Sequence, residues 1–122
     1  MAPNSLISKF KIKPKANLKV FGTADGENQK SLVTLDRVWK KCASEGIKRS
    51  DAIIGLGGGA TTDLAGFASA TWMRGIDWYA MPTSLAGMVD ASVGGKTGIN
   101  ASSGKNLIGA FHSPKQVFVS NG

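Results

Sequence analysis

The chain has few of the residues that hold metals or form cross-links. It contains one cysteine and one histidine among 122 residues. Cys42 can form no internal disulfide, which is typical of proteins in a reducing compartment. Cys42 and His112 lie far apart in the sequence and do not have metal-ligand spacing, so we expect no metal site. We interpret Cys42 as a core residue and His112 as a loop residue.

Long apolar runs are also missing. No stretch approaches the roughly 20 apolar residues that a transmembrane helix needs, and the start MAPNSLISKF lacks the apolar region of a signal peptide. We therefore expect a cytoplasmic protein with no membrane partner.

Acidic residues are scarce, because 8 Asp and Glu stand against 15 Lys and Arg, and the formal net charge is +7. Such a balance favours anionic partners. Five lysines belong to one N-terminal run, which has no aromatic residue beyond Phe10 and matches no nucleic-acid-binding module. We interpret the run as a solvated edge or loose arm and expect no nucleic-acid partner. These lysines are Lys9, Lys11, Lys13, Lys15 and Lys19.

Apolar patterning predicts alternating strands and helices, which indicates an α/β fold with a mostly parallel, Rossmann-like sheet and flanking helices. A helix is expected from Ser31 to a glycine stop at Gly46, with Leu32, Leu35, Trp39, Cys42 and Ala43 on its apolar face. Further helices are expected at 61–73 and 85–91, and strands at 17–23, 52–56, 77–82 and 116–120. Residues 1–16 are expected to be partial or poorly ordered, and 17–122 to form the α/β domain.

The segment GLGGGATTD, residues 55–63, places a glycine turn between a strand and a helix. Free backbone N–H groups at such a turn attract anions. The pattern satisfies GxGxxA, but Asp77 would start its strand and so lie at the wrong end of the sheet for a dinucleotide fingerprint. Phosphate binding and a merely tight turn both remain open. Asp63, near the helix start, and Arg74, at its end, could simply complement the helix dipole.

A second glycine-rich segment, residues 87–106, holds Asp90, Lys96, Lys105 and Asn106. Two ammonium groups on a glycine-rich backbone can cradle a phosphate or a carboxylate. GGKTG lacks the spacing of a P-loop, so an NTPase is not indicated. Asp90 beside the lysines would have a lowered pKa and could orient a hydroxyl group or move a proton. A structural ion pair is the alternative.

At these residues the chain resembles the 3-dehydroquinate synthases, a family of sugar-phosphate cyclases. The matching blocks are DGENQKS at 25–31, GGGATTDLAGFASATWMRG at 57–75, PTSLAGMVDASVGGKTGIN at 82–100 and GKNLIGAFHSP at 104–114. Iron-type alcohol and glycerol dehydrogenases share the fold and the GlyGlyGly turn. After ProThr, however, they continue AlaGlyThrGlySer, whereas this chain runs LeuAlaGlyMetValAsp from residue 85.

The resemblance implies NAD as cofactor and a phosphorylated small-molecule substrate. Arg74 matches an arginine of the substrate phosphate site, by analogy across a dimer interface, so the full-length enzyme is expected to be a homodimer. The implied catalytic residues are Asp90, Lys96, Asn106 and Arg74. The implied NAD contacts are Asp25, Glu27, Lys30, Gly58, Gly59, Asp63, Thr83, Ser84, Lys96 and Lys105, with Ser84 replacing the second threonine of a ThrThr pair.

The implied function is cyclisation of 3-deoxy-D-arabino-heptulosonate 7-phosphate to 3-dehydroquinate with phosphate release, in the shikimate pathway. The family holds its zinc or cobalt in a later helical domain, whose ligands are not in this chain. The chain is therefore expected to be a fragment, inactive alone. A related sugar-phosphate cyclase or a non-catalytic nucleotide- or phosphate-binding module remains an alternative.

Overall fold

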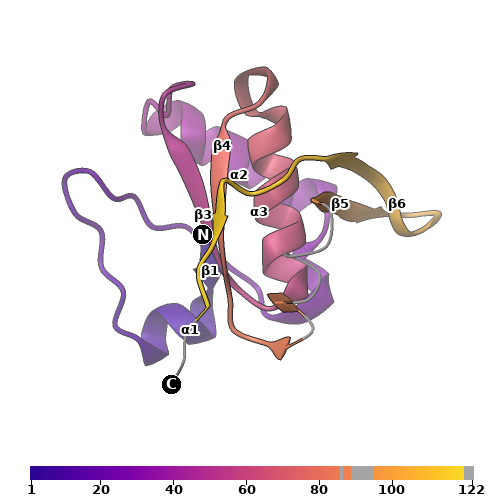
Figure 1. Cartoon of the computed structure of the whole chain (residues 1–122), viewed down its shortest axis with the longest axis horizontal. Helices are drawn as coiled ribbons and strands as arrows, with labels where there is room; N and C mark the ends of the chain where they lie inside the picture. The colour runs from indigo at the N-terminus through magenta and orange to yellow at the C-terminus, as the bar shows by residue number, and fades with distance from the viewer. Residues whose placement is uncertain (86, 89–94, 120–122) are drawn as a thin grey trace.

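The predicted α/β class is confirmed. The computed structural model describes residues 1–85, 87–88 and 95–119 (Figure 1). No helix in this part of the chain is long and apolar enough to cross a membrane. The helices are α1 (Asn4–Lys9), α2 (Leu32–Ser44) and α3 (Gly59–Thr71), with 3-10 helices η1 (Gly26–Gln29) and η2 (Trp72–Arg74). The strands are β1 (Ala2–Pro3), β2 (Gly22–Thr23), β3 (Ala52–Gly57), β4 (Asp77–Pro82), β5 (Lys96–Ala101), β6 (Gly104–Phe111) and β7 (Gln116–Val117).

The strands are mostly parallel, as predicted. β3 pairs with β4 from Ala52 opposite Asp77 to Gly57 opposite Pro82, and β4 pairs with β7. β1 and β2 also run parallel. Among the named strands of the described residues, β5 and β6 alone pair antiparallel, as a hairpin. Parallel pairing brings the carboxyl ends of β3 and β4 to one edge, where ligands of open α/β sheets bind.

Helix α2 begins and ends where its sequence predicts. The Ser31 hydroxyl accepts a hydrogen bond from the Thr34 N–H, and Gly46 at φ +66° follows the last turn. Ile47 N–H donates to the Cys42 carbonyl, which completes a Schellman motif. The predicted apolar face is partly wrong, because Leu32 and Ala43 are exposed. The buried residues of α2 are Leu35, Val38 and Cys42, which are three and four positions apart and therefore lie on one face of the helix.

Helix α3 lies between the three-stranded sheet and the hairpin (Figure 1). Its small residues allow this close approach. A Cβ atom at Gly66 would collide with Thr97 Cγ2 of β5 and lie 2.8 Å from Trp78 Cζ2 of β4. Leu64, Ala65 and other buried residues of α3 therefore form one core with α2, β3, β4 and β5. The helix begins at Gly59, two residues before the predicted start.

Two predicted strands are shorter in the structure. Strand 17–23 is reduced to Gly22–Thr23, because Leu18 pairs back to Lys15 and β1 offers only two partner residues. Strand 116–120 is described only at Gln116–Val117. Of the predicted helix 85–91, Leu85, Gly87 and Met88 are helical and the rest lies outside the described residues.

Two segments gain structure that the sequence did not predict. From Lys96 on, the glycine-rich segment belongs to the β5–β6 hairpin. Residues 1–16 contain β1 and α1. The lysine run begins with Lys9 in α1 and continues through the largely exposed stretch that follows. The division of the chain at residue 16 stays a prediction.

Candidate functional site

The glycine turn occupies the carboxyl edge of the sheet, as predicted. Gly57 ends β3 at φ +156°, a backbone conformation that favours glycine, and its carbonyl accepts a hydrogen bond from Thr83 N–H at 2.8 Å. Ser84 follows on the next residue, and its hydroxyl accepts a hydrogen bond from Gly87 N–H at 3.0 Å. The ends of β3 and β4 thus bring Thr83 and Ser84 to the start of α3.

This helix start suits an anion. The N-cap residue of α3 is Gly58, which has no side chain to satisfy the first backbone N–H groups of the helix. A Cβ atom built on Gly58 would meet only Ser84 Oγ, at 3.7 Å, within 4 Å. Among the described residues, no other atom lies that close to this position, although Gly87 packs near the Gly59 nitrogen. The free backbone N–H groups and the positive end of the helix dipole suit a phosphate or pyrophosphate group.

A buried ammonium group lies next to this turn. The Lys30 side chain is only 2% exposed, and its Nζ atom lies 2.9 Å from Asp63 Oδ2 in the second turn of α3. The same Nζ atom donates a hydrogen bond to Asn106 Oδ1 of β6. Glu27 Oε2 lies 3.9 Å away and its side chain is 52% exposed. The Lys30 ammonium group therefore joins Asp63 and Glu27, which like Lys30 are predicted NAD contacts, to the predicted catalytic residue Asn106.

The sequence alone is compatible with Asp63 as a complement of the helix dipole in the first turn. The structure places it beyond that turn, because α3 begins at Gly59 and has no acidic residue in its first turn. Its ion pair with Lys30 ties α3 to the loop that follows η1. The Asp63 carboxylate is therefore explained by its ion pair with Lys30 and not by the dipole of α3.

Sequence reasoning missed two residues that organise this cluster. Asn100 of β5 donates from Nδ2 to Glu27 Oε2 at 3.0 Å, and its Oδ1 accepts from Asn106 N–H at 3.0 Å. Gln29 is buried, and its Oε1 accepts hydrogen bonds from the hydroxyls of Thr23 and Thr61. Both residues stand inside the matched blocks, but nothing in their local spacing marks them. Asn100 reaches Glu27 across 73 positions and Gln29 reaches Thr61 across 32, so a local pattern cannot reveal these two contacts.

The two lysines of the second segment lie on the hairpin. Lys96 begins β5 and Lys105 is in β6, and both side chains are exposed. Neither forms an ion pair with any residue that the structure describes. Asp90, the predicted catalytic carboxylate, lies outside the described residues.

Two predicted site residues are not brought to the cluster. Arg74 is exposed at φ +67° after the far end of α3. The 13 residues of α3 separate it from Gly58 by about 20 Å along the helix axis. Asp25 accepts a hydrogen bond from the Ser5 hydroxyl of α1 at 2.6 Å, which ties it to the N-terminal segment.

The predicted places of Cys42 in the core and of His112 in a loop are confirmed. Cys42 is buried in the core, and burial raises the pKa of its thiol. His112 lies in the loop after β6, where its Nε2 atom is 2.7 Å from the Ile76 carbonyl oxygen. Among the described residues, no three His, Cys, Asp or Glu side chains come together as metal ligands.

These features define an α/β protein with a glycine turn between a strand and a helix at the carboxyl edge of a parallel sheet. Residues 20–122 match the family described as 3-dehydroquinate synthase N-terminal, and the chain belongs to this family. The 3-dehydroquinate synthase of Streptomyces avermitilis is 56% identical over 93 residues, which are 76% of this chain and 26% of that protein. That of Corynebacterium jeikeium is 58% identical over 95 residues, 78% of this chain and 26% of that protein. The chain thus spans about a quarter of the length of the curated relatives it matches.

Solved structures agree with this assignment. A 2-deoxy-scyllo-inosose synthase complexed with carbaglucose-6-phosphate, NAD+ and Co2+ matches 84% of this chain and 28% of its own, with 32% identity and a TM-score of 0.79. ValA, a 2-epi-5-epi-valiolone synthase from Streptomyces hygroscopicus with NAD+ and Zn2+ bound, matches 79% of this chain and 27% of its own, with 31% identity and a TM-score of 0.73. A probable glycerol dehydrogenase from Sinorhizobium meliloti covers 97% of this chain and 31% of its own at 21% identity and a TM-score of 0.65, which shows the shared fold alone.

Proposed function

We propose that this chain is the NAD-binding part of a cytoplasmic 3-dehydroquinate synthase. The full-length enzyme, a phosphate-eliminating carbon–oxygen lyase of the shikimate pathway, cyclises 3-deoxy-D-arabino-heptulosonate 7-phosphate to 3-dehydroquinate. The observation that carries the proposal is the meeting of Lys30, Asp63 and Asn106 beside the glycine turn. The family match over residues 20–122 supports the same activity.

NAD fits the residues present. The N–H groups at the start of α3 suit its pyrophosphate, and the absence of a side chain at Gly58 lets the phosphate oxygens approach the backbone. The exposed Glu27 carboxylate is an acceptor for a ribose hydroxyl, held in place by Asn100. A bound NAD would supply hydride transfer between its nicotinamide and a ring hydroxyl carbon of the substrate, in both directions. Two solved relatives, the inosose synthase and ValA, contain NAD+.

The hairpin supplies charge for the substrate. Lys96 and Lys105 present exposed ammonium groups, which favour a phosphate or a carboxylate. Asn106 supplies an amide beside the cofactor cluster, and Asp90 orients a reacting hydroxyl group. Arg74 lies too far from Gly58 to serve the same chain's site, so we assign it to the neighbouring site of a homodimer.

A divalent metal does not fit the described residues, because they contain no cluster of three suitable ligands. The cobalt and zinc of the solved relatives therefore have no counterpart in this part of the chain. For the 122-residue chain alone, we expect cofactor binding without phosphate release.

The test is calorimetric titration with NAD+ of the chain and of Gly58→Ala. The new methyl group lies no closer than 3.7 Å to any atom of the described residues, so we expect the fold to tolerate it, but it occupies the space beside the helix start. We expect weak binding to the native chain and a roughly tenfold loss in Gly58→Ala, about 1.4 kcal/mol. The control is Ser103→Ala in the turn between β5 and β6, which should bind NAD+ with the same affinity as the native chain. Equal affinity of Gly58→Ala and the native chain would refute the assigned cofactor position.

A related sugar-phosphate cyclase is the second candidate, because the solved relatives at 31% to 32% identity are an inosose synthase and a valiolone synthase. The product of the complete coding sequence distinguishes the candidates. Phosphate release from the heptulosonate phosphate supports the first, and release only from another sugar phosphate supports the second. NAD+ binding without phosphate release from any of these substrates supports a non-catalytic module.

A further inference from the structure

The β5–β6 hairpin contains a β-bulge at Asn100. The residues paired across the hairpin on either side of it are Ile99 with Ile108 and Ala101 with Gly104. Between these pairs, Asn100 stands alone on β5 against residues 105–107 on β6. Bulges of this kind interrupt the ladder and often lie next to active sites, where they redirect a side chain. The irregularity therefore calls for an account of where the polar groups of Asn100 go.

The backbone of Asn100 is bonded outside the hairpin. Its N–H group donates to the Lys30 carbonyl oxygen at 2.9 Å, in the loop after η1. The bulge thus ties β5 to the same residue whose ammonium group is buried against Asp63. Asn100 is half-buried at this junction, and its side chain lies between β6 and η1.

The Asn100 amide group uses each of its two ends for one residue. Its Oδ1 atom accepts from the Asn106 backbone N–H at 3.0 Å, and its Nδ2 atom donates to Glu27 Oε2 at 3.0 Å. These partners fix the orientation of the amide, because the reverse orientation would place oxygen against the carboxylate and NH2 against an N–H group. The position therefore needs a side chain that has both a donor and an acceptor.

Asn106 depends on the first of these bonds. It has φ +55°, in the left-handed region that residues other than glycine seldom adopt, although asparagine does so more readily than most. It belongs to the stretch of β6 that the bulge leaves without a residue in register. The Asn100 oxygen supplies an acceptor for its N–H group there, and so stabilises this conformation.

In this conformation the Asn106 side chain reaches Lys30. Because an ammonium group can only donate, the amide oxygen of Asn106 must face it, and Oδ1 accepts from Lys30 Nζ. The Nδ2 end of the Asn106 amide is left for a ligand, since it forms no hydrogen bond within the described residues. An exposed N–H donor in this cluster suits an oxygen of a phosphate, hydroxyl or carbonyl group.

We infer that Asn100 is a positioning residue of the cofactor and substrate site. Its amide holds the Glu27 carboxylate for the cofactor and the Asn106 amide for the substrate, and it fixes these two groups relative to each other. The inference rests on the proposed function, in which Glu27 binds a ribose hydroxyl and Asn106 is catalytic. It adds a residue that acts on both ligands through its neighbours.

The first test is calorimetric titration with NAD+ of Asn100→Asp. This change keeps an oxygen for the Asn106 N–H group but replaces the donor to Glu27 by a second carboxylate. We expect roughly tenfold weaker NAD+ binding. Adding Glu27→Gln restores a hydrogen bond with donor and acceptor exchanged, so the double variant should bind NAD+ about threefold or more tightly than Asn100→Asp alone.

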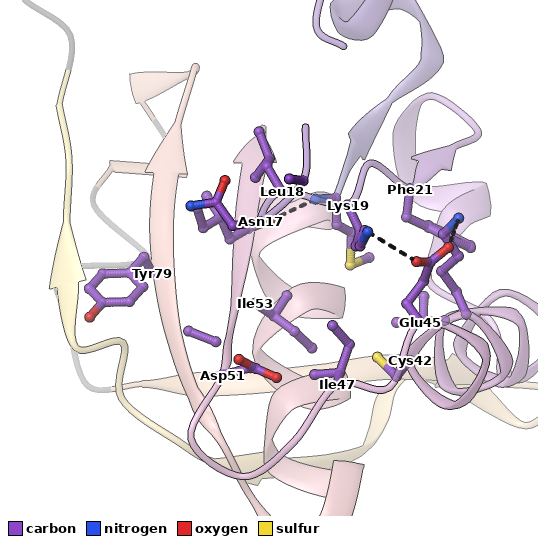
Figure 2. Close-up of a pocket in the computed structure, with 16 residues that line it drawn as sticks. Asn17, Leu18, Lys19, Phe21, Cys42, Glu45, Ile47, Asp51, Ile53 and Tyr79 are labelled. Carbon is purple, nitrogen blue, oxygen red and sulfur yellow. Dashed lines mark hydrogen bonds and ion pairs between the residues drawn. The ribbon is translucent and has the colours of Figure 1, made fainter. Parts of the chain in front are cut away.

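The matched control is Asn17→Asp, the same chemical change at an exposed asparagine away from the cluster. Asn17 lines a separate cavity of about 410 Å³ at α2 and β3 (Figure 2). None of Glu27, Lys30, Asn100 and Asn106 lies in the wall of this cavity. The control should therefore bind NAD+ with the affinity of the native chain.

The second test is amide hydrogen exchange of Asn106, followed by NMR without ligand. Asn100→Asp keeps the acceptor oxygen and should leave the exchange rate unchanged, whereas Asn100→Ala should raise it roughly tenfold. Urea unfolding of both variants gives their stability. If NAD+ affinity and Asn106 protection fall together in both variants, in proportion to the loss of stability, the role of Asn100 is structural and the inference is overturned.

Two further results would overturn the inference and leave the proposed function intact. One is native NAD+ affinity in both Asn100→Asp and Asn100→Ala, although Gly58→Ala weakens binding. The other is a double variant with Glu27→Gln that binds NAD+ no better than Asn100→Asp. A native chain that binds no NAD+ would instead refute the proposed function, and the inference with it.

Discussion

The Lys30 ammonium group lies 2.9 Å from the Asp63 carboxylate, and this ion pair joins the loop after η1 to α3 beside the glycine turn. The lysine side chain is 2% exposed and the aspartate side chain 27%. A charge buried to this degree is stable only with its partners. The wall of the proposed cofactor site is therefore organised by residues distant in sequence before any ligand binds.

Replacing Lys30 by methionine should destabilise the fold. The change leaves the Asp63 carboxylate and the Asn106 amide oxygen without their common donor. We expect a loss of about 1 to 3 kcal/mol, below the cost of breaking a fully buried pair because Asp63 is partly exposed. Urea unfolding followed by circular dichroism measures it. The control is Lys40→Met, which breaks an exposed pair with Asp36 and should change stability by about 0.5 kcal/mol or less. Equal losses in the two variants would contradict the account.

Stability should rise between pH 6 and pH 8 in a chain with a free Met1 amino group. Desolvation against β3 lowers the pKa of this amine from 8.0 to about 6, despite an opposing effect of Cys42. The unfolded chain therefore binds more protons in this range, so protonation as the pH falls favours unfolding. The shift corresponds to about 2 to 3 kcal/mol. Unfolding at several pH values measures the slope. Acetylation of Met1 should remove this contribution, and an identical slope after acetylation would contradict it.

Cys42 should react slowly with a thiol reagent in the native protein. Burial raises the pKa of this thiol and blocks access to it. Cys42 is the only cysteine, so modification reports on this position alone. We expect labelling in native buffer to be about a hundredfold slower than in urea. A native rate close to the denatured rate would show that the packing between α2 and β3 is wrong.

Gly66→Ala should destabilise the protein although alanine favours helices. The new Cβ atom collides with Thr97 Cγ2 and crowds Trp78. Overpacking of this kind costs about 1 to 3 kcal/mol, more than the gain of about 1 kcal/mol in helix propensity. The double variant Gly66→Ala with Thr97→Ser removes the colliding methyl group and keeps the hydroxyl that donates to Ala110. Thermal unfolding should show partial recovery, and a double variant that only adds a further loss would refute the cause.

The sequence predicted those helices and strands whose ends depend on neighbouring residues. Ser31 and Gly46 mark the ends of α2, and the apolar run from Ala52 predicts β3. The hairpin was not predicted, because its glycines interrupt the alternation of apolar and polar residues that is typical of a strand. Its position depends instead on the packing of Thr97 against Gly66 across 31 positions of sequence.

The same distinction holds for the site. The glycine turn at Gly57–Gly59 was recognisable because a strand, a turn and a helix follow one another. The link from Lys30 to Asp63 and Asn106 spans 33 and 76 positions, so no local pattern could predict it. Asn100 was overlooked for the same reason, since its role appears only when β5 and η1 are side by side.

The most direct test of the central claim is an NMR titration of the 122-residue chain with NAD+. The account predicts that the largest amide shifts occur at Gly58, Gly59, Asp63, Ser84 and Asn106, with little change at Lys115 beyond the sheet. In Gly58→Ala these shifts should require roughly tenfold more NAD+. Shifts confined to other parts of the chain, or none at millimolar NAD+, would contradict the assignment of this edge of the sheet as the cofactor site.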